Sequence, residues 1–123
     1  MVKVLFDTNI LIDYLNGISD AAKEIGRYRE KAISLITWME VMAGASAQDE
    51  LLIKTFLSQF ELLPIDGTVS AEAVLIRRAR RMKLPDAIIL ASARTTGRLL
   101  ITRNTKDFPV GMDVDVRMPY RYP

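Results

Sequence analysis

Acid-base or metal chemistry in this sequence must rest on carboxylates, amides, hydroxyls, lysines or arginines, and three carboxylates stand out by their positions. Histidine and cysteine are both absent, which excludes a Ser-His-Asp triad, a thiolate nucleophile and a histidine-ligated metal site. Asp7 directly follows the apolar run 2–6, and Glu40 comes shortly after the run 32–36. Asp86 begins another helical stretch. Since ligands of parallel sheets bind beyond the carboxyl ends of the strands, we expect these three acids at one edge.

Three carboxylates at one sheet edge indicate a site for a divalent cation. In a pocket of low dielectric constant they repel one another, and a hard cation such as Mg²⁺ or Mn²⁺ relieves that repulsion. A cation held in this way can lower the pKa of a bound water and can bind a phosphate oxygen. Hydrolysis of a phosphodiester on such a site requires no histidine.

Each acid also has a purely structural interpretation. Asp7 has the residue type favoured at the N-cap of a helix. Thr37 and Glu40 fit a capping box, with Thr37 as N-cap and Glu40 at the third helical position. Asp86 lies in a first helical turn, where a negative charge interacts favourably with the helix dipole. The functional interpretation therefore depends on the convergence of all three acids.

The elements that must position these acids alternate along the chain. Short apolar runs separated by helical patterns are typical of a parallel sheet covered on both faces. We predict a three-layer α/β/α fold with a central, mainly parallel sheet of four to five strands, and one domain over residues 1–123. The predicted strands are 2–6, 32–36, 61–65, 99–102 and 113–116. The predicted helices are 8–15, 19–29, 38–45, 47–60, 68–83 and 87–96.

Basic residues cluster near Asp86 in the sequence. The formal net charge is only +2, so clustering matters more than the total. Arg77, Arg78, Arg80 and Arg81 span about one helical turn. One interpretation is a solvated helix face; the other is contact with phosphate groups. For the second we name Arg77, Arg81 and Arg103 as candidate RNA phosphate contacts.

Four segments of the chain together resemble a known family. They are Val4–Asn9 (VLFDTN), Thr37–Val41 (TWMEV), Leu84–Ala91 (LPDAIILA) and Ile101–Phe108 (ITRNTKDF). The sequence resembles the PIN domain and, within it, the VapC-type toxins of type II toxin–antitoxin pairs. The resemblance implies a PIN-like fold and a Mg²⁺- or Mn²⁺-dependent endoribonuclease.

The resemblance also implies roles for particular residues. Asp7, Glu40 and Asp86 would form the acidic core and bind the metal, with Asp7 and Asp86 as the firmest ligands. Many members carry a fourth acid where this chain has Asn104. Asn104 can still bind a metal or orient a water, and Asp107 is the alternative residue to complete the site.

Partners and location follow from the same resemblance. It implies an RNA substrate, a cognate VapB-like antitoxin and a homodimer formed through apolar surface on the first helices. No stretch approaches the roughly 20 apolar residues of a membrane span. We therefore expect no membrane contact and a cytoplasmic location.

Two other functions are compatible with parts of the pattern. A catalytically degenerate PIN domain would only bind RNA or a partner, and Asn104 is the feature that favours it. A receiver-like phosphoacceptor domain could use Asp66 as acceptor and Lys106 as its lysine. Receivers usually place adjacent acids after the first strand, whereas Asp7 is followed by Thr8 and Asn9.

Overall fold

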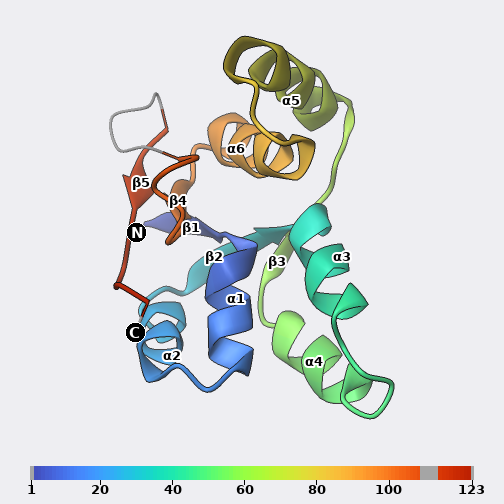
Figure 1. Ribbon diagram of the computed structural model, residues 1–123, viewed down its shortest axis with the longest axis vertical. Coiled ribbons are helices and arrows are strands. Elements are labelled where there is room, and N and C mark those ends of the chain that lie inside the picture. The colour runs from blue at the N-terminus through green and yellow to red at the C-terminus, as the bar shows by residue number, and fades with distance from the viewer. Residues whose placement is uncertain (1, 109–113, 123) are drawn as a thin grey trace.

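The computed structural model describes residues 2–108 and 114–122, and consists of a parallel sheet with helices on both faces (Figure 1). The strands are β1 (Lys3–Phe6), β2 (Glu30–Ser34), β3 (Glu61–Leu63), β4 (Leu99–Ile101) and β5 (Val116–Arg117). The helices are α1 (Thr8–Leu15), α2 (Ser19–Gly26), α3 (Leu35–Ala43), α4 (Glu50–Leu57), α5 (Gly67–Arg80) and α6 (Leu84–Thr96). The three-layer α/β/α prediction is confirmed.

The sheet places β1 at its centre. Its strand order is β3-β2-β1-β4-β5, and every neighbouring pair is parallel. Phe6 of β1 is paired in register with Ile101 of β4. The residues that directly follow these two strands therefore emerge side by side at the carboxyl edge.

The two faces of the sheet belong to different apolar cores. Helices α5 and α6 cover one face, and α1 to α4 lie on the other (Figure 1). In β1, Leu5 packs toward α5 and α6, while Val4 and Phe6 pack toward the opposite layer. This alternation is the two-residue period of a strand. Because both faces of the sheet are covered by helices, consecutive residues of the strand can all be apolar.

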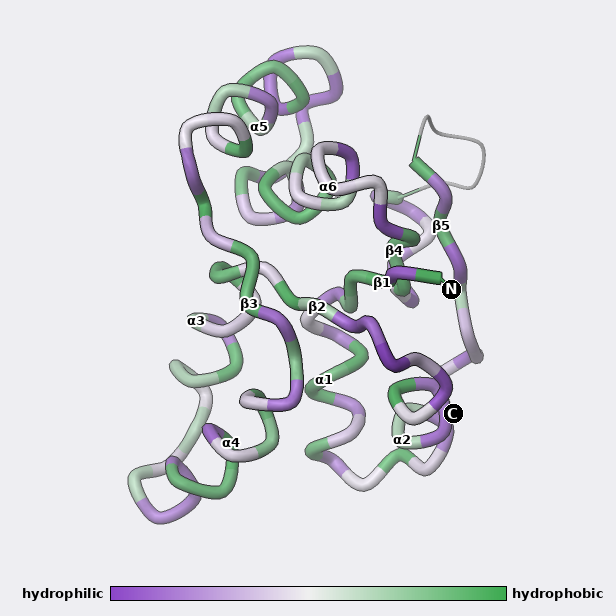
Figure 2. Tube along the Cα trace, turned by 180° about the vertical axis from the view of Figure 1, so that it is seen from behind, coloured by the Kyte–Doolittle hydropathy of each residue, from purple (hydrophilic) through white to green (hydrophobic). Residues whose placement is uncertain are grey.

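Hydropathy changes sharply where β2 enters the sheet. The hydrophilic segment 27–31 leads into the hydrophobic part of β2 (Figure 2). Ala32 and Ile33 are fully buried on opposite faces of the sheet.

No helix within the described part of the chain has the length and apolar character needed to cross a membrane.

Helix α3 begins earlier than the capping-box pattern predicts. Its N-cap is Ser34, whose Oγ accepts a hydrogen bond from Ile36 N at 3.2 Å. Thr37 is therefore a helical residue and is buried, so the predicted role of Thr37 as N-cap is wrong. The reason is that Ser34 at the end of β2 supplies the cap, which places Glu40 in the second turn of the helix.

The turn between α5 and α6 also differs from the predicted helix end at residue 83. Helix α5 ends at Arg80, and Arg81 caps it in the left-handed conformation with φ of 53°. The buried side chain of Met82 anchors this turn. Arg77 Nη1 donates a hydrogen bond to Met82 O at 2.8 Å. The break brings Pro85 and Asp86 into the first turn of α6.

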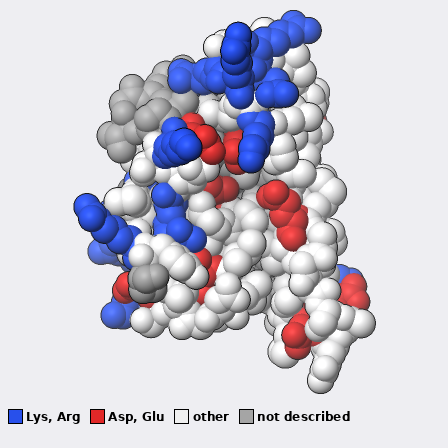
Figure 3. All heavy atoms as spheres, in the orientation of Figure 1, with Lys and Arg blue, Asp and Glu red and all other residues white. Residues whose placement is uncertain are grey.

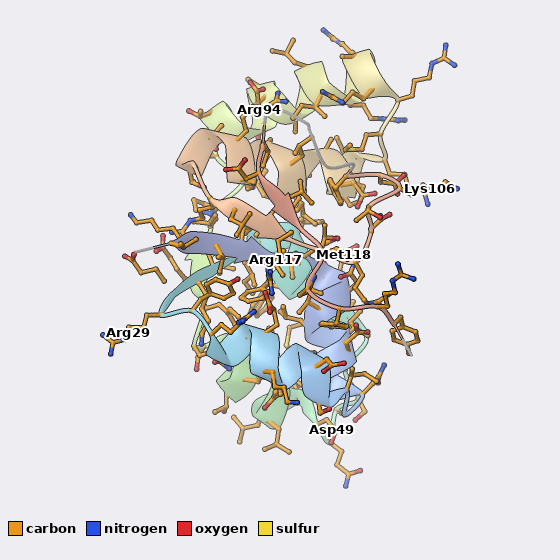
Figure 4. The ribbon with its side chains drawn as sticks, turned by 90° about the vertical axis from the view of Figure 1, so that its left-hand side faces the viewer. Arg29, Asp49, Arg94, Lys106, Arg117 and Met118 are labelled. Carbon is orange, nitrogen blue, oxygen red and sulfur yellow. The ribbon has the colours of Figure 1, made fainter. Side chains whose placement is uncertain are left out.

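Residues 118–122 after β5 are irregular, and buried acids of α1 and α2 bind side chains from this segment, from β5 and from the segment that follows β4. Asp13 of α1 accepts hydrogen bonds from Arg103 Nε at 2.6 Å and from Tyr120 Oη at 2.8 Å. Glu24 of α2 pairs with Arg117 of β5 at 2.8 Å, and Figure 4 shows Arg117 in the region between β5 and α2. These contacts join the end of the chain to its first two helices.

Candidate active site

Asp7 lies at the junction of β1 and α1. It is the N-cap of α1, and its backbone N donates to Ile101 O of β4 at 2.9 Å. The side chain is 4% exposed. The structural role of Asp7 as N-cap is confirmed and is compatible with the functional prediction, because the cap fixes the position of the carboxylate at the sheet edge.

Neutral groups supply all the hydrogen bonds that Asp7 receives from the described residues. Thr8 N donates to Oδ1 at 2.8 Å, while Asn9 Nδ2 at 3.1 Å and Thr102 Oγ1 at 2.7 Å donate to Oδ2. No ion pair to Asp7 forms within residues 2–108 and 114–122. A buried carboxylate without a cation is an unfavourable arrangement unless a cation binds from outside.

Electrostatics connects Asp7 to the other two acids. The pKa of Asp7 is raised to about 6: burial is the largest cause, the hydrogen bonds it accepts lower the pKa, and the negative charges of Asp86 and Glu40 raise it. The pKa of Asp86 is also raised, first by burial and then by the charges of Asp107 and Glu40. The structure thus brings the three predicted acids, and Asp107, within electrostatic reach of one another.

Two threonines orient Glu40. Thr8 Oγ1 lies 2.8 Å from Glu40 Oε1 and 3.0 Å from Thr37 Oγ1. A hydroxyl carries one proton and a carboxylate only accepts, so Thr8 donates to Glu40 and accepts from Thr37. The early start of α3 makes this possible, because it buries Thr37 beneath Thr8. Glu40 itself remains exposed.

Asn104 and Asp107 form a closed pair after β4. Asn104 Nδ2 donates to Asp107 Oδ2 at 2.9 Å, and Asp107 N donates to Asn104 Oδ1 at 3.2 Å. Thr102 Oγ1 accepts from Asn104 N at 2.9 Å while it donates to Asp7. Thr102 therefore links the Asn104–Asp107 pair to the buried carboxylate.

The donor set of this edge suits a hard divalent cation. Within the described ranges, no three acidic side chains converge closely enough to form a ready ion-binding cluster. The groups that face one another are carboxylates and an amide, which are the oxygen ligands that Mg²⁺ and Mn²⁺ prefer. Their mutual repulsion would be relieved by such an ion, so the residues present fit the group.

The remaining sequence candidates lie outside this cluster of acids. Asp66 caps α5 and accepts from Val69 N at 2.9 Å, away from the Asp7 group beyond edge strand β3. Arg103 is engaged by Asp13, and Arg77 by the backbone of Met82. Arg81 is exposed at the end of α5. This placement gives the receiver-like alternative no acceptor beside the acids.

Sequence reasoning missed the polar residues that hold the acids. Thr8, Asn9 and Thr102 bind Asp7 or Glu40 directly. One signal could have found them: a short polar cluster follows both β1 and β4. The pairing of Phe6 with Ile101 then places Asp7 beside Thr102.

Comparison with known proteins identifies the family. The PIN domain family matches residues 4–110. The chain belongs to the PIN domain family. It is 28% identical over 120 residues to the tRNA(fMet)-specific endonuclease VapC of Shigella flexneri, covering 88% of this chain and 91% of that protein.

Solved structures agree with this family assignment. A chain of a toxin–antitoxin complex from Klebsiella pneumoniae is 44% identical to this PIN domain, with a TM-score of 0.91, covering 98% of this chain and all of that one. A chain of a DNA-bound VapBC complex from Salmonella typhimurium is 23% identical, with a TM-score of 0.81, and covers 95% of this chain and 98% of that one. The second likeness concerns the fold alone. The acids described above thus belong to a VapC-like PIN domain.

Proposed function

We propose that this PIN domain is a Mg²⁺- or Mn²⁺-dependent endoribonuclease and the toxin of a toxin–antitoxin pair. The observation that carries the proposal is Asp7, a buried carboxylate that receives only neutral donors from the described residues and lies near two further acids. The VapC relative named as an endonuclease supports the activity. The Klebsiella toxin–antitoxin structure supports the biological role.

Asp7 and Asp86 would hold the metal, and Glu40 would bind it or orient a water. Thr8 fixes one oxygen of Glu40, and Thr102 fixes one oxygen of Asp7. These neutral donors orient the carboxylates without neutralising them, so the negative charge stays available to a cation.

Asn104 and Asp107 together would take the place of the fourth acid that many members of the family carry. Asn104 supplies an amide and Asp107 a charge, and each holds the other in place. We propose that Asp107 contributes its charge while it is hydrogen-bonded to Asn104; this is supported by the raised pKa of Asp86, of which burial is the largest cause and the charge of Asp107 the next. The bound cation supplies an activated water and neutralises charge at the phosphate.

An antitoxin would bind beside these acids. A groove of about 390 Å³ between α1, α3 and α4 is lined by apolar residues and also by Glu40. The apolar lining includes Ile12, Leu15, Val41 and Leu52, of which Ile12, Leu15 and Leu52 are exposed. A helix-in-groove partner could cover this surface and reach Glu40 at its end. The predicted homodimer stays a prediction.

The function is tested by RNA cleavage with purified protein. Total tRNA is a suitable substrate, because the Shigella relative is named as specific for a tRNA. We expect cleavage with Mg²⁺ or Mn²⁺, no cleavage with EDTA, and a loss of at least about a hundredfold in Asp7→Asn. Asp20→Asn, which changes an exposed acid of α2, should leave the rate unchanged.

Two measurements separate an enzyme from a degenerate domain. Circular dichroism should show that Asp7→Asn is folded, and calorimetry should show Mg²⁺ binding to the wild type only. Retained cleavage in folded Asp7→Asn would contradict the proposed site. A wild type that binds RNA but neither binds Mg²⁺ nor cleaves would favour the degenerate alternative.

A further inference from the structure

A second groove lies beside the acids and is lined mainly by cations. It has a volume of about 330 Å³, and we call it the basic groove. Its lining residues are Arg80, Arg81, Met82, Lys83, Lys106 and Asp107. One wall is the turn between α5 and α6, and the other is the segment that follows β4. On the face shown in Figure 3, Lys and Arg side chains gather over α5, above acidic side chains in the middle of the face.

The first wall is held in place by its backbone and by one anchor. Met82 is buried, so the residues on either side of it, Arg81 and Lys83, remain exposed. Arg77 binds Met82 O at 2.8 Å, and Ala87 N donates to Lys83 O at 2.9 Å. A short turn that is tied at both ends presents its two cations with little loss of backbone entropy on binding.

Arg81 occupies a conformation that normally favours glycine. Its φ is 53°, and it is the only non-glycine residue with positive φ in the described part of the chain. Gly97 has the same role at the end of α6, with φ of 65°. The left-handed conformation costs a non-glycine residue some stability, so replacement of Arg81 by glycine should relieve this cost.

The second wall is tied to the active site. Asp107 is bound by Asn104, and Phe108 is fully buried, so Lys106 lies on an anchored segment. Asp107 faces the basic groove and also acts electrostatically on Asp86, as does Lys83. The basic groove therefore adjoins the carboxylates directly.

The four cations of the basic groove form no ion pairs within the described residues. Other cations of this protein do: Arg103 pairs with Asp13, and Arg117 with Glu24. Asp107, the acid that lines the basic groove, is hydrogen-bonded by Asn104 instead. Four clustered, unpaired cations attract a polyanion and release its counterions on contact.

We propose that the basic groove binds a backbone phosphate of the RNA strand next to the phosphate that is cut. This inference rests on the proposed function and adds where the strand runs. The acids alone repel a phosphodiester, so a strand needs a cationic contact close by to remain bound. The basic groove supplies it from both walls, through Arg81 and Lys83 on one and Lys106 on the other.

The test is RNA binding by the double variant Lys83→Gln with Lys106→Gln, in which two cationic side chains are replaced by neutral ones. The probe is a short fluorescein-labelled single-stranded RNA, followed by anisotropy in EDTA at several salt concentrations. We expect about tenfold weaker binding, and the slope of the logarithm of affinity against the logarithm of salt concentration should be smaller by about 0.7, since each phosphate contact contributes about 0.7 on single strands. The matched control is Arg29→Gln, which removes a cation on the opposite side of the molecule from Lys106 (Figure 4).

A second variant separates binding from folding. Arg81→Gly removes a cation but also relieves the left-handed conformation, so its melting temperature should rise while RNA affinity falls. Neither variant changes a residue of the acidic site.

The outcomes distinguish this proposal from the proposed function. If the double variant binds RNA with the affinity and salt dependence of the wild type, the proposed role of the basic groove in RNA binding is wrong, even if the protein cleaves RNA. The same result with weaker binding of the antitoxin would assign the basic groove to a protein partner instead. If the variants bind RNA more weakly but the wild type cleaves no RNA, the result supports RNA binding by the basic groove and contradicts the proposed nuclease activity.

Discussion

Asp7 and Asp13 lie just before and near the end of the same helix, α1, and both are almost completely buried. Asp13 accepts two hydrogen bonds from the guanidinium of Arg103 and one from Tyr120. Among the residues that the structure describes, Asp7 accepts hydrogen bonds only from neutral donors, and it faces two more acids. Within residues 2–108 and 114–122, the charge of Asp13 is compensated by a cation and the charge of Asp7 is not.

Glu24 of α2 behaves like Asp13. It is buried and binds the guanidinium of Arg117 and the hydroxyl of Tyr28. Burial raises the pKa of Tyr28, and its hydrogen bond to Glu24 raises it further. The comparison indicates that this fold can pair buried acids with arginines, and that at Asp7 it does not.

The largest expected effect on stability comes from Asp13→Ala. It leaves Arg103 and Tyr120 without their acceptor, and breaking a partly buried pair of this kind costs about 3 kcal/mol. Urea unfolding should show this loss. The control Asp20→Ala removes an exposed acid and should cost less than about 1 kcal/mol. A similar small cost for Asp13→Ala would contradict the structural role assigned to it.

Asp7→Asn should be more stable than the wild type, and only at neutral pH. The folded protein holds the pKa of Asp7 at about 6 rather than 3.8 and therefore binds more protons than the unfolded chain between these values. Wild-type stability should consequently fall as pH rises through this window. The total change is about 3 kcal/mol relative to Asp7→Asn, from a shift of about two pKa units.

This difference is measured by unfolding both proteins in EDTA at about pH 4 and pH 7. Saturating Mg²⁺ should reduce it, because a bound cation favours the ionised carboxylate. A pH dependence that is identical in the two proteins would show that Asp7 is not held in an unfavourable ionised state.

The smallest expected effects come from the two tyrosines. Tyr120→Phe removes a 2.8 Å hydrogen bond to Asp13, and Tyr28→Phe removes a 3.1 Å hydrogen bond to Glu24. Each should cost about 1 to 2 kcal/mol in thermal or urea unfolding, because the acceptor is charged. Cleavage should persist in both variants when they are folded. Loss of cleavage in folded Tyr120→Phe would show that the C-terminal segment acts on the site.

Much of the candidate site was accessible from sequence, because strand ends can be located from apolar runs. Asp7 was found in this way, whereas Asp86 was found from its place in the first turn of a helix. The position of Glu40 was predicted by a pattern that proved wrong in detail. Ser34, rather than Thr37, caps α3, because hydrogen bonding at the end of β2 decides where the helix begins.

The sequence by itself determined the layered parallel fold, the exclusion of histidine and thiolate chemistry, and the acids at the carboxyl edge. Only the tertiary structure decided which charges are paired. Arg103 could not be assigned to Asp13 from sequence, because their contact joins residues at opposite ends of the chain. The same holds for the link from Thr102 to Asp7, which depends on the register of two neighbouring strands. Local patterns place a carboxylate at an edge, but its charge state depends on every group that packs around it.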